Sequence, residues 1–219
     1  MSVSRKTNAG LFITFEGVEG CGKSTQSRLL KAQMDAFGVP SIVTYEPGFT
    51  PLGEEITRLL KWKDEVPISP LSELLLFNAS RAQLVAEVVK PALMKGTTVI
   101  CDRYADSTVA YQGYGRQLDL ALVTQANTIG TLGLVPDRTF FLDIPVEKGM
   151  ERKLGDKPDR FESETIEFHR RVREGFLSLA RSGPERWTVI DGLLPAAAIS
   201  EMIWKNVNEL LAGGSGGTC

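Results

Sequence analysis

Short apolar runs alternate along the chain with longer segments in which apolar residues recur at helical spacing. The runs predict five strands, at 11–15, 41–45, 97–101, 139–144 and 187–190. The longer segments predict helices, at 22–37, 52–62, 70–94, 107–112, 118–132, 162–181 and 195–211. Strands that alternate with helices favour a parallel sheet with helices on both faces and ligands at the carboxyl ends of the strands. We therefore expect a three-layer α/β fold.

Glycine, proline and polar stretches mark the expected breaks between elements. Pro91 is expected to bend or end the helix over 70–94, and 113–115 to form a turn. The segment 151–160 has almost no apolar residues, so we expect it to be loop-like and mobile, within a short lid over about 148–161. The expected organisation is a flexible start at 1–10, one domain at 11–211 and a flexible Gly/Ser tail at 212–219.

A glycine-rich loop follows the first predicted strand and matches the pattern G-x-x-x-x-G-K-[ST]. The N–H groups of such a loop point inward around an anion, and the following helix adds its positive end. Lys23 can reach the terminal phosphates of a nucleotide, and the Ser24 hydroxyl is a suitable ligand for Mg²⁺. The residues expected to bind the nucleotide are Gly17, Val18, Glu19, Gly20, Cys21, Gly22, Lys23, Ser24 and Thr25.

Three other predicted strands also end in polar residues, at 46–48, 102–104 and Asp143. With the glycine-rich loop they would frame one cleft that is wide enough for more than one ligand. Asp102 would then lie near the metal and Arg103 near the phosphates, although the two could instead form an exposed ion pair. The hydroxyls, ring and amide over 107–113 suit the recognition of a base and a sugar.

Charge and cysteine content restrict the partners and the compartment. With 25 basic and 27 acidic residues the net charge is −2, which gives no reason to expect nucleic acid or an anionic membrane as a partner. Cys21, Cys101 and Cys219 are too far apart for a C-x-x-C motif, and we interpret them as reduced thiols. We find neither an apolar leader nor a membrane-spanning run, and we expect a cytoplasmic protein.

From Leu11 to about Leu211 the chain resembles the thymidylate kinases, a branch of the nucleoside monophosphate kinase family. The resemblance rests on five motifs in the same order, at 17–25, 46–48, 75–81, 102–104 with 107–113, and 159–162. It implies a P-loop kinase fold with a five-stranded parallel sheet, and a homodimer. It also implies transfer of the γ-phosphoryl group of ATP to dTMP with Mg²⁺, which gives dTDP and ADP.

The same resemblance implies individual roles for residues of the acceptor site. Phe77 would stack on the thymine ring and Arg81 would hydrogen-bond its edge, although from the residues alone both could be ordinary positions of a helix. Arg58 and Arg103 would hold the dTMP phosphate. The other residues implied are Glu19 at the sugar 3′-hydroxyl, Tyr111 against C2′ so that deoxyribose is preferred, and Glu46, Ser107, Thr108 and Gln112.

The chain departs from the family pattern at two positions. Phe49 stands where family members often have a second glycine, which is expected to change the shape of that turn. Gly20 stands where some members carry an arginine, so the resemblance is to the subgroup whose catalytic cation comes from the lid. The lid looks shorter than is usual there, and its candidate cations are Arg152, Lys153 and Arg160, of which we favour Arg152.

Other functions of a phosphate loop fit the sequence less well. A GTPase-type switch would need N-K-x-D, which is absent, and the D-x-x-G at 35–38 closes a helix. A kinase for another nucleoside monophosphate would differ only in its base pocket. A vestigial site is disfavoured by intact Lys23, Ser24, Asp102 and Arg103. Because an acceptor phosphate is already anionic, no general base is needed, and we interpret His169 as structural or exposed.

Overall fold

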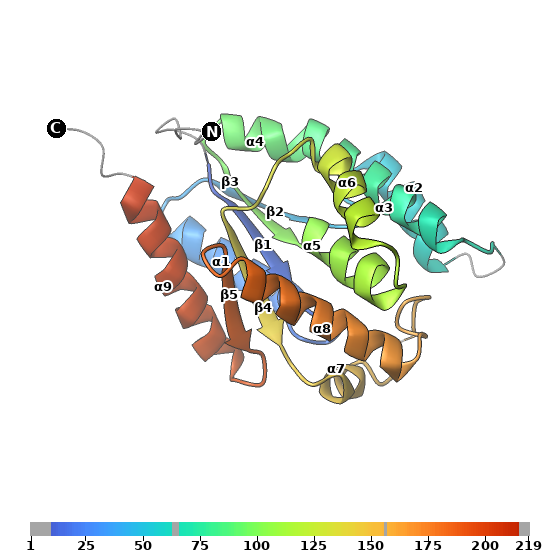
Figure 1. Ribbon diagram of the computed structural model, residues 1–219. Helices are drawn as coiled ribbons and strands as arrows, with labels where there is room; N and C mark the ends of the chain where they lie inside the picture. The colour runs from blue at the N-terminus through green and yellow to red at the C-terminus, as the bar shows by residue number, and fades with distance from the viewer. Residues whose placement is uncertain (1–9, 63–65, 156, 215–219) are drawn as a thin grey trace.

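The computed structural model describes residues 10–62, 66–155 and 157–214, and within them five parallel strands form one sheet in the order β2-β3-β1-β4-β5 (Figure 1). The strands are β1 (Phe12–Glu16), β2 (Ser41–Tyr45), β3 (Thr98–Asp102), β4 (Arg138–Asp143) and β5 (Trp187–Asp191). Every neighbouring pair is parallel. The predicted α/β class and the five-stranded parallel sheet are confirmed.

The central strand explains why one edge of the sheet collects the polar residues. All five residues of β1 are buried between β3 and β4, as a continuous apolar run predicts. Phe15 is in register with Asp102 of β3, and Glu16 with Phe141 of β4. The loop that leaves β1 therefore starts beside the carboxyl end of β3, where Asp102 and Arg103 lie.

Helices cover both faces of the sheet (Figure 1). On one face α1 (Lys23–Ala36) packs against α9 (Ala196–Gly214), and on the other α8 (Ile166–Ser182) crosses β4 and β5. The helices α2 (Pro51–Trp62), α3 (Pro70–Leu84) and α6 (Leu120–Thr131) pack against one another in that order, and Leu84 at the end of α3 is buried with Phe12 of β1 and Val99 of β3. None of the helices in the described part of the chain is long and apolar enough to cross a bilayer.

The long helix predicted over 70–94 changes its hydrogen-bonding pattern before Pro91. It consists of α3, a π-helical segment η1 (Val85–Val89) and α4 (Lys90–Met94). Proline lacks an N–H and its ring crowds the carbonyl of the residue four positions earlier, here Glu87. The wider turn of η1 occurs at this point, and the chain continues as a helix through Pro91.

The predicted turn at 113–115 is wrong, because these residues are helical. The helix α5 (Ala105–Thr108) continues as the π-helical segment η2 (Val109–Gly115). Its glycines permit close packing: a Cβ on Gly113 would lie 2.7 Å from Leu120, and one on Gly115 would lie 2.7 Å from Phe168. Glycine signals a turn in sequence, but here it lets η2 lie against α6 and α8.

The two ends of the lid have more regular structure and burial than its polar composition predicts. Residues at its start form α7 (Val146–Arg152), which lies directly on the glycine-rich loop: a Cβ on Gly149 would be 2.3 Å from the carbonyl oxygen of Glu19. At its other end Asp159 and Phe161 are buried. The expectation that 151–160 is loop-like is therefore wrong at its ends, because residues 151 and 152 belong to α7 and Asp159 is buried.

Some predicted boundaries differ from the structure, and others lie outside the described residues. The helix predicted to begin at Glu162 begins at Ile166, since the Thr165 side chain caps it. The closing helix continues to Gly214, past the predicted end at Leu211. The flexible start and the rest of the tail fall on 1–9 and 215–219, and one lid position on 156, all outside the described residues.

Candidate functional site

The glycine-rich loop between β1 and α1 has the backbone of an anion cradle. Three of its glycines have positive φ angles, 143° at Gly17, 70° at Gly20 and 100° at Gly22, which other residues adopt only with strain. Lys23 is 6% exposed, and its Nζ donates to the carbonyl oxygens of Gly17 at 3.2 Å and Val18 at 3.0 Å. Lys23 therefore lies across the loop with its charge beside the space that an anion would fill.

The predicted metal ligands are brought together at the end of β3. The Ser24 hydroxyl, in the first turn of α1, donates a hydrogen bond to Oδ2 of Asp102. Both residues line an open cleft, which we call the phosphate-loop cleft. Its lining residues are Glu19, Gly20, Gly22, Lys23, Ser24, Thr25, Tyr45, Glu46, Pro47, Thr57, Lys61, Trp62, Asp102, Arg103, Arg152 and Lys153. The side chains of Val18 and Cys21 are buried in the core.

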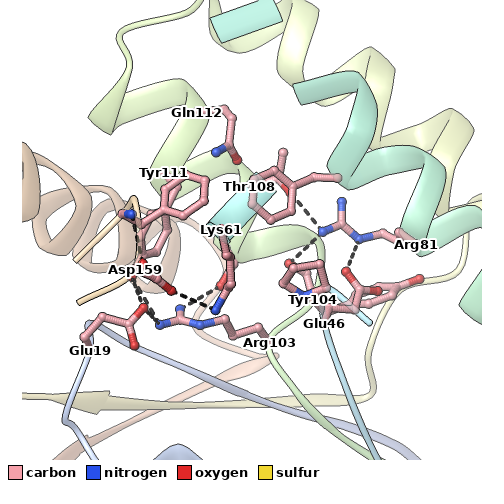
Figure 2. A pocket seen from close by; sticks show the side chains of 14 residues that line it. Glu19, Glu46, Lys61, Arg81, Arg103, Tyr104, Thr108, Tyr111, Gln112 and Asp159 are labelled. Atoms are coloured by element: carbon pink, nitrogen blue, oxygen red, sulfur yellow. Dashed lines mark hydrogen bonds and ion pairs between the residues drawn. The ribbon is translucent and has the colours of Figure 1, made fainter. Parts of the chain in front are cut away.

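A second cavity opens beside this cleft, and we call it the inner pocket (Figure 2). Its walls come from α2, α3, α5, η2, the loop after β2 and the end of the lid. Its lining residues are Glu19, Glu46, Pro47, Lys61, Phe77, Arg81, Arg103, Tyr104, Ser107, Thr108, Tyr111, Gln112, Asp159 and Phe161. All the residues predicted for the acceptor site lie here, apart from Arg58.

Aromatic rings form one side of the inner pocket. Phe77 of α3 lies 5.5 Å from the ring of Phe161, measured between centroids, and Phe161 lies 6.3 Å from the ring of Tyr111. The end of the lid thus contributes an aromatic wall opposite α3. Phe161 belongs to the segment 159–162 that carries part of the family resemblance, but the sequence did not predict that its ring would line the site.

Arg81 is 1% exposed, and all five of its N–H groups face acceptors. Nε donates to Oε2 of Glu46 at 2.7 Å, and Nη1 and Nη2 donate to the side chains of Asn78, Asn127 and Thr108 and to the Tyr104 carbonyl. Arg81 therefore joins α3 to α5, to α6 through Asn127, and to the turn after β2, and Figure 2 shows its contacts with Glu46, Tyr104 and Thr108. A hydrogen bond from Arg81 to a base would have to replace one of these five.

Glu46 presents an acceptor between the two cavities. Its Oε2 accepts from Arg81, while its Oε1 is buried and has no partner among the described residues. Burial raises the pKa of the Glu46 carboxyl, although Arg81 opposes the shift. Because Glu46 lines both the inner pocket and the phosphate-loop cleft, a ligand hydroxyl or N–H group could satisfy this oxygen.

Arg103 projects into the space between the two cavities from a strained backbone. Its φ angle is 69°, in the left-handed region. Its guanidinium donates to Oε1 of Glu19 at 2.6 Å, to the Tyr111 hydroxyl at 3.1 Å and to the Gly17 carbonyl at 2.9 Å. Burial alone would raise the pKa of Glu19, but Arg103, Lys23 and Lys61 outweigh it, so Glu19 is ionised.

Glu16 holds the Arg103 turn and was missed as a functional residue from the sequence. It is fully buried at the end of β1, where Oε1 accepts from the backbone N–H of Tyr104 at 2.8 Å and Oε2 from the hydroxyl of Ser107 at 2.5 Å. Ser107 in turn accepts from Nη1 of Arg103 at 3.1 Å. One carboxyl group thus fixes the turn on both sides of Arg103.

The Glu16 carboxyl predicts a pH-dependent stability. Burial, reinforced by Asp106, raises its pKa to about 8. Between its ordinary value and about 8 the folded chain keeps a proton that the unfolded chain has released, so the free energy of unfolding falls as the pH rises. Glu16→Gln cannot titrate, and its amide oxygen can still accept from the Tyr104 N–H while its NH2 group donates to the Ser107 hydroxyl oxygen. In calorimetry from about pH 5 to about pH 9, the melting temperature of Glu16→Gln minus that of wild type is expected to increase as the pH increases. A difference that stays constant over this pH range would contradict the prediction.

The three candidate lid cations lie in different surroundings. Arg152 lines the phosphate-loop cleft, and its Nη1 donates to the carbonyl oxygens of Gly20 at 3.2 Å and Gly192 at 3.3 Å. Lys153 also lines the cleft and pairs with Glu162 at 3.3 Å. Arg160 lines neither cavity, and its Nη2 donates to the carbonyl oxygen of Ile68 at 3.0 Å.

Arg58 and His169 lie away from both cavities. The Arg58 side chain is 57% exposed and forms an ion pair with Glu55, one turn earlier on α2. His169 is buried on α8, and burial lowers its pKa, which fits the structural role predicted for it. Cys21 and Cys101 are buried and free, and Cys219 is outside the described residues.

Comparisons with known proteins agree with this geometry. A family model described as Thymidylate kinase matches residues 15–203. A thymidylate kinase of Dehalococcoides mccartyi is 52% identical over 201 residues, which cover 92% of this chain and 97% of the relative. One of a Nostoc species is 48% identical over 206 residues, which cover 93% and 96%.

A solved structure gives the same answer for the fold. The crystal structure of thymidylate kinase from Ehrlichia chaffeensis is similar to this chain with a TM-score of 0.71 and 36% identity, and the match covers 93% of this chain and 99% of that one. Similarity in sequence and in fold therefore extends over nearly the whole length of both partners. We conclude that this chain belongs to the thymidylate kinase family.

Proposed function

We propose that this enzyme, which phosphorylates dTMP to dTDP, binds dTMP in the inner pocket and ATP in the phosphate-loop cleft. The observation that carries this arrangement is the wall that the two cavities share, formed by Glu19, Glu46, Pro47, Lys61 and Arg103. A monophosphate whose base lies against Phe77 would place its phosphate at this wall. The terminal phosphate of ATP would reach the same wall from the side of Lys23, so the two phosphates would meet in line.

The residues at the end of β3 fit a magnesium ion. Mg²⁺ takes one or two protein oxygens and completes its coordination with water and nucleotide phosphates. The Ser24 hydroxyl and the Asp102 carboxylate meet at the loop and line the cleft, so they would hold the ion. When bound, Mg²⁺ would offset negative charge on the phosphates of ATP.

Charge neutralisation is the main chemical task of the chain's own residues. An acceptor phosphate oxygen is anionic and attacks without a general base. Lys23 would stabilise charge on the moving phosphoryl group, and Arg103 would orient the acceptor phosphate. The lid would exclude water, which protects ATP from hydrolysis.

Phe77 supplies a test of where the base binds. A base stacked on an aromatic ring gains about 1–3 kcal/mol, so Phe77→Ala is expected to weaken binding of thymidine about 5- to 150-fold. Phe77→Tyr keeps the ring and should bind thymidine nearly as wild type does. Isothermal titration calorimetry with thymidine measures this directly. Unchanged affinity in Phe77→Ala would place the base elsewhere.

We further propose that this chain takes its catalytic cation from the lid, and that Arg152 is that cation. A side chain at position 20 has no room, because a Cβ on Gly20 would lie 2.4 Å from the carbonyl oxygen of Gly149 in α7. An arginine in the loop would push α7 away. Arg152, three residues further along α7, already contacts the loop at Gly20 and lines the cleft.

A homodimer completes the proposal. Exposed leucine and isoleucine side chains lie on α2, α3 and α6, which pack side by side (Figure 1), among them Leu52, Leu71, Leu75, Leu120, Leu122 and Ile129. Such a face can pack against the same face of a second copy about a two-fold axis. We also propose a cytoplasmic location, which the free thiols fit.

The dimer face can be tested with one double variant. Leu75 is 55% and Ile129 is 75% exposed, so neither contributes much to the core of the subunit. Multi-angle light scattering at micromolar concentration should report a dimer for wild type and a folded monomer for Leu75→Arg combined with Ile129→Arg. A monomeric wild type would contradict the proposal.

A further inference from the structure

Two cations face the place where the phosphates would meet. Of the five residues that line both cavities, Lys61 and Arg103 carry positive charge. Arg103 was predicted from the sequence, whereas Lys61 belonged to none of the expected sets. A doubly charged acceptor phosphate between two cavities requires cations at that boundary. Lys61 is therefore a candidate for the phosphate contact that the family resemblance implied for Arg58.

The geometry of α2 separates Lys61 from Arg58. Thr57 and Lys61 are one turn apart, so they share a helix face, and both line the phosphate-loop cleft. Arg58 is one position further round the helix than Thr57, lines neither cavity and pairs with Glu55. The face of α2 that looks toward the phosphates thus presents an ammonium group and not a guanidinium.

Lys61 is held in place by the lid. Its Nζ lies 3.0 Å from Oδ2 of Asp159, which is buried, and Figure 2 shows this contact at the edge of the inner pocket. Asp159 is fixed independently, because its Oδ1 accepts from the backbone N–H groups of Phe161 and Glu162. An ammonium group has three donors, so Lys61 can keep Asp159 and still bind a phosphate. Its charge also helps to lower the pKa of Glu19, after Arg103 and Lys23.

We propose that Lys61 binds the phosphate of dTMP opposite Arg103, and that Asp159 holds its ammonium group in that position. The inference rests on the proposed placement of dTMP in the inner pocket. The acceptor site would then have two phosphate-binding cations, Arg103 after β3 and Lys61 on α2, and Asp159 would connect Lys61 to the lid. Thymidine, which has the same base and sugar but no phosphate, should not depend on Lys61.

The test compares dTMP with thymidine by titration calorimetry on the full chain. Lys61→Ala is expected to lose about 10- to 100-fold in affinity for dTMP, the loss expected for one charge-assisted hydrogen bond, while thymidine affinity stays within about twofold. Lys61→Arg should recover most of the dTMP affinity. Asp159→Asn, which loosens the tether but keeps the cation, should lose much less than Lys61→Ala.

Several results would overturn the proposal. Equal losses for dTMP and thymidine would show that Lys61 only maintains the fold of α2. A loss in Asp159→Asn equal to that in Lys61→Ala would show that Lys61 acts only through the lid. A larger loss for Arg58→Ala would return the role to Arg58. If wild type bound neither dTMP nor thymidine, the proposed placement of dTMP in the inner pocket would fail. If wild type bound both, and Lys61→Ala had the same ratio of dTMP affinity to thymidine affinity as wild type, only the role of Lys61 would fail.

Discussion

Lys23→Ala is expected to lower kcat for dTMP phosphorylation about 10²- to 10³-fold. Lys23 lies across the phosphate loop, bonded to the carbonyl oxygens of Gly17 and Val18, where its charge would move onto the terminal phosphates of ATP. No other cation of the loop can take its place, because the remaining loop residues 17–25 are neutral or acidic. A coupled assay of ADP formation with dTMP measures the effect.

Lys31 on the same helix provides the control. It is paired with Asp35 on the exposed side of α1, so Lys31→Ala should leave kcat near wild type. Circular dichroism and the melting temperature should show that Lys23→Ala remains folded. If folded Lys23→Ala retained a wild-type kcat, the phosphate loop would not be the donor site.

Arg152→Ala is expected to reduce kcat by about 10³-fold or more, the effect of removing an arginine that neutralises a transition state in phosphoryl transfer. Arg152 reaches the phosphate loop from α7 through the Gly20 carbonyl oxygen. Because Arg152 would interact with the negative charge that develops on the phosphoryl group during transfer, KM for dTMP should change much less than kcat. Steady-state kinetics with both substrates varied separate the two parameters.

The other lid cations distinguish this assignment from its alternatives. Arg160 donates to the carbonyl oxygen of Ile68 and lines neither cavity, so Arg160→Ala should affect kcat far less. Lys153 lines the cleft beside Arg152, and Lys153→Ala should have an intermediate effect. If Lys153→Ala lost more activity than Arg152→Ala, the catalytic cation would be Lys153.

The sheet and its ligand-bearing edge could be predicted because each depends on local pattern. Buried parallel strands are continuous apolar runs, and the polar residues that follow them gather at one edge whatever the helices do. That reasoning placed Asp102 and Arg103 beside the glycine-rich loop, where the structure has them in contact with Ser24 and Gly17. The order of motifs along the chain then indicated which ligands the edge would take.

What could not be predicted depended on packing between distant segments. The helical state of 113–115 follows from contacts of Gly113 and Gly115 with α6 and α8, while glycine alone favours a turn. Likewise α7 is stabilised against the loop through Gly149 and Gly20, which no periodicity reveals. A polar segment is expected to be mobile only if no other part of the chain offers it a fixed contact.

The candidate site shows the same division. Arg58 and Lys61 are both cations on one predicted helix, and only the orientation of α2 decides that Lys61 faces the cavities. Arg81 was expected to read a base, yet its N–H groups are used by five acceptors of the protein. Glu16 ends a buried strand, and its role becomes visible only when the Arg103 turn folds back over it.

A crystal structure with dTMP bound would test the arrangement of the two cavities most directly. We expect the thymine ring to lie against Phe77 in the inner pocket and the phosphate to lie at the shared wall between Arg103 and Lys61, facing Lys23 across the cleft. A dTMP molecule bound outside the inner pocket, or bound inside it with its phosphate turned away from the phosphate loop, would contradict the account.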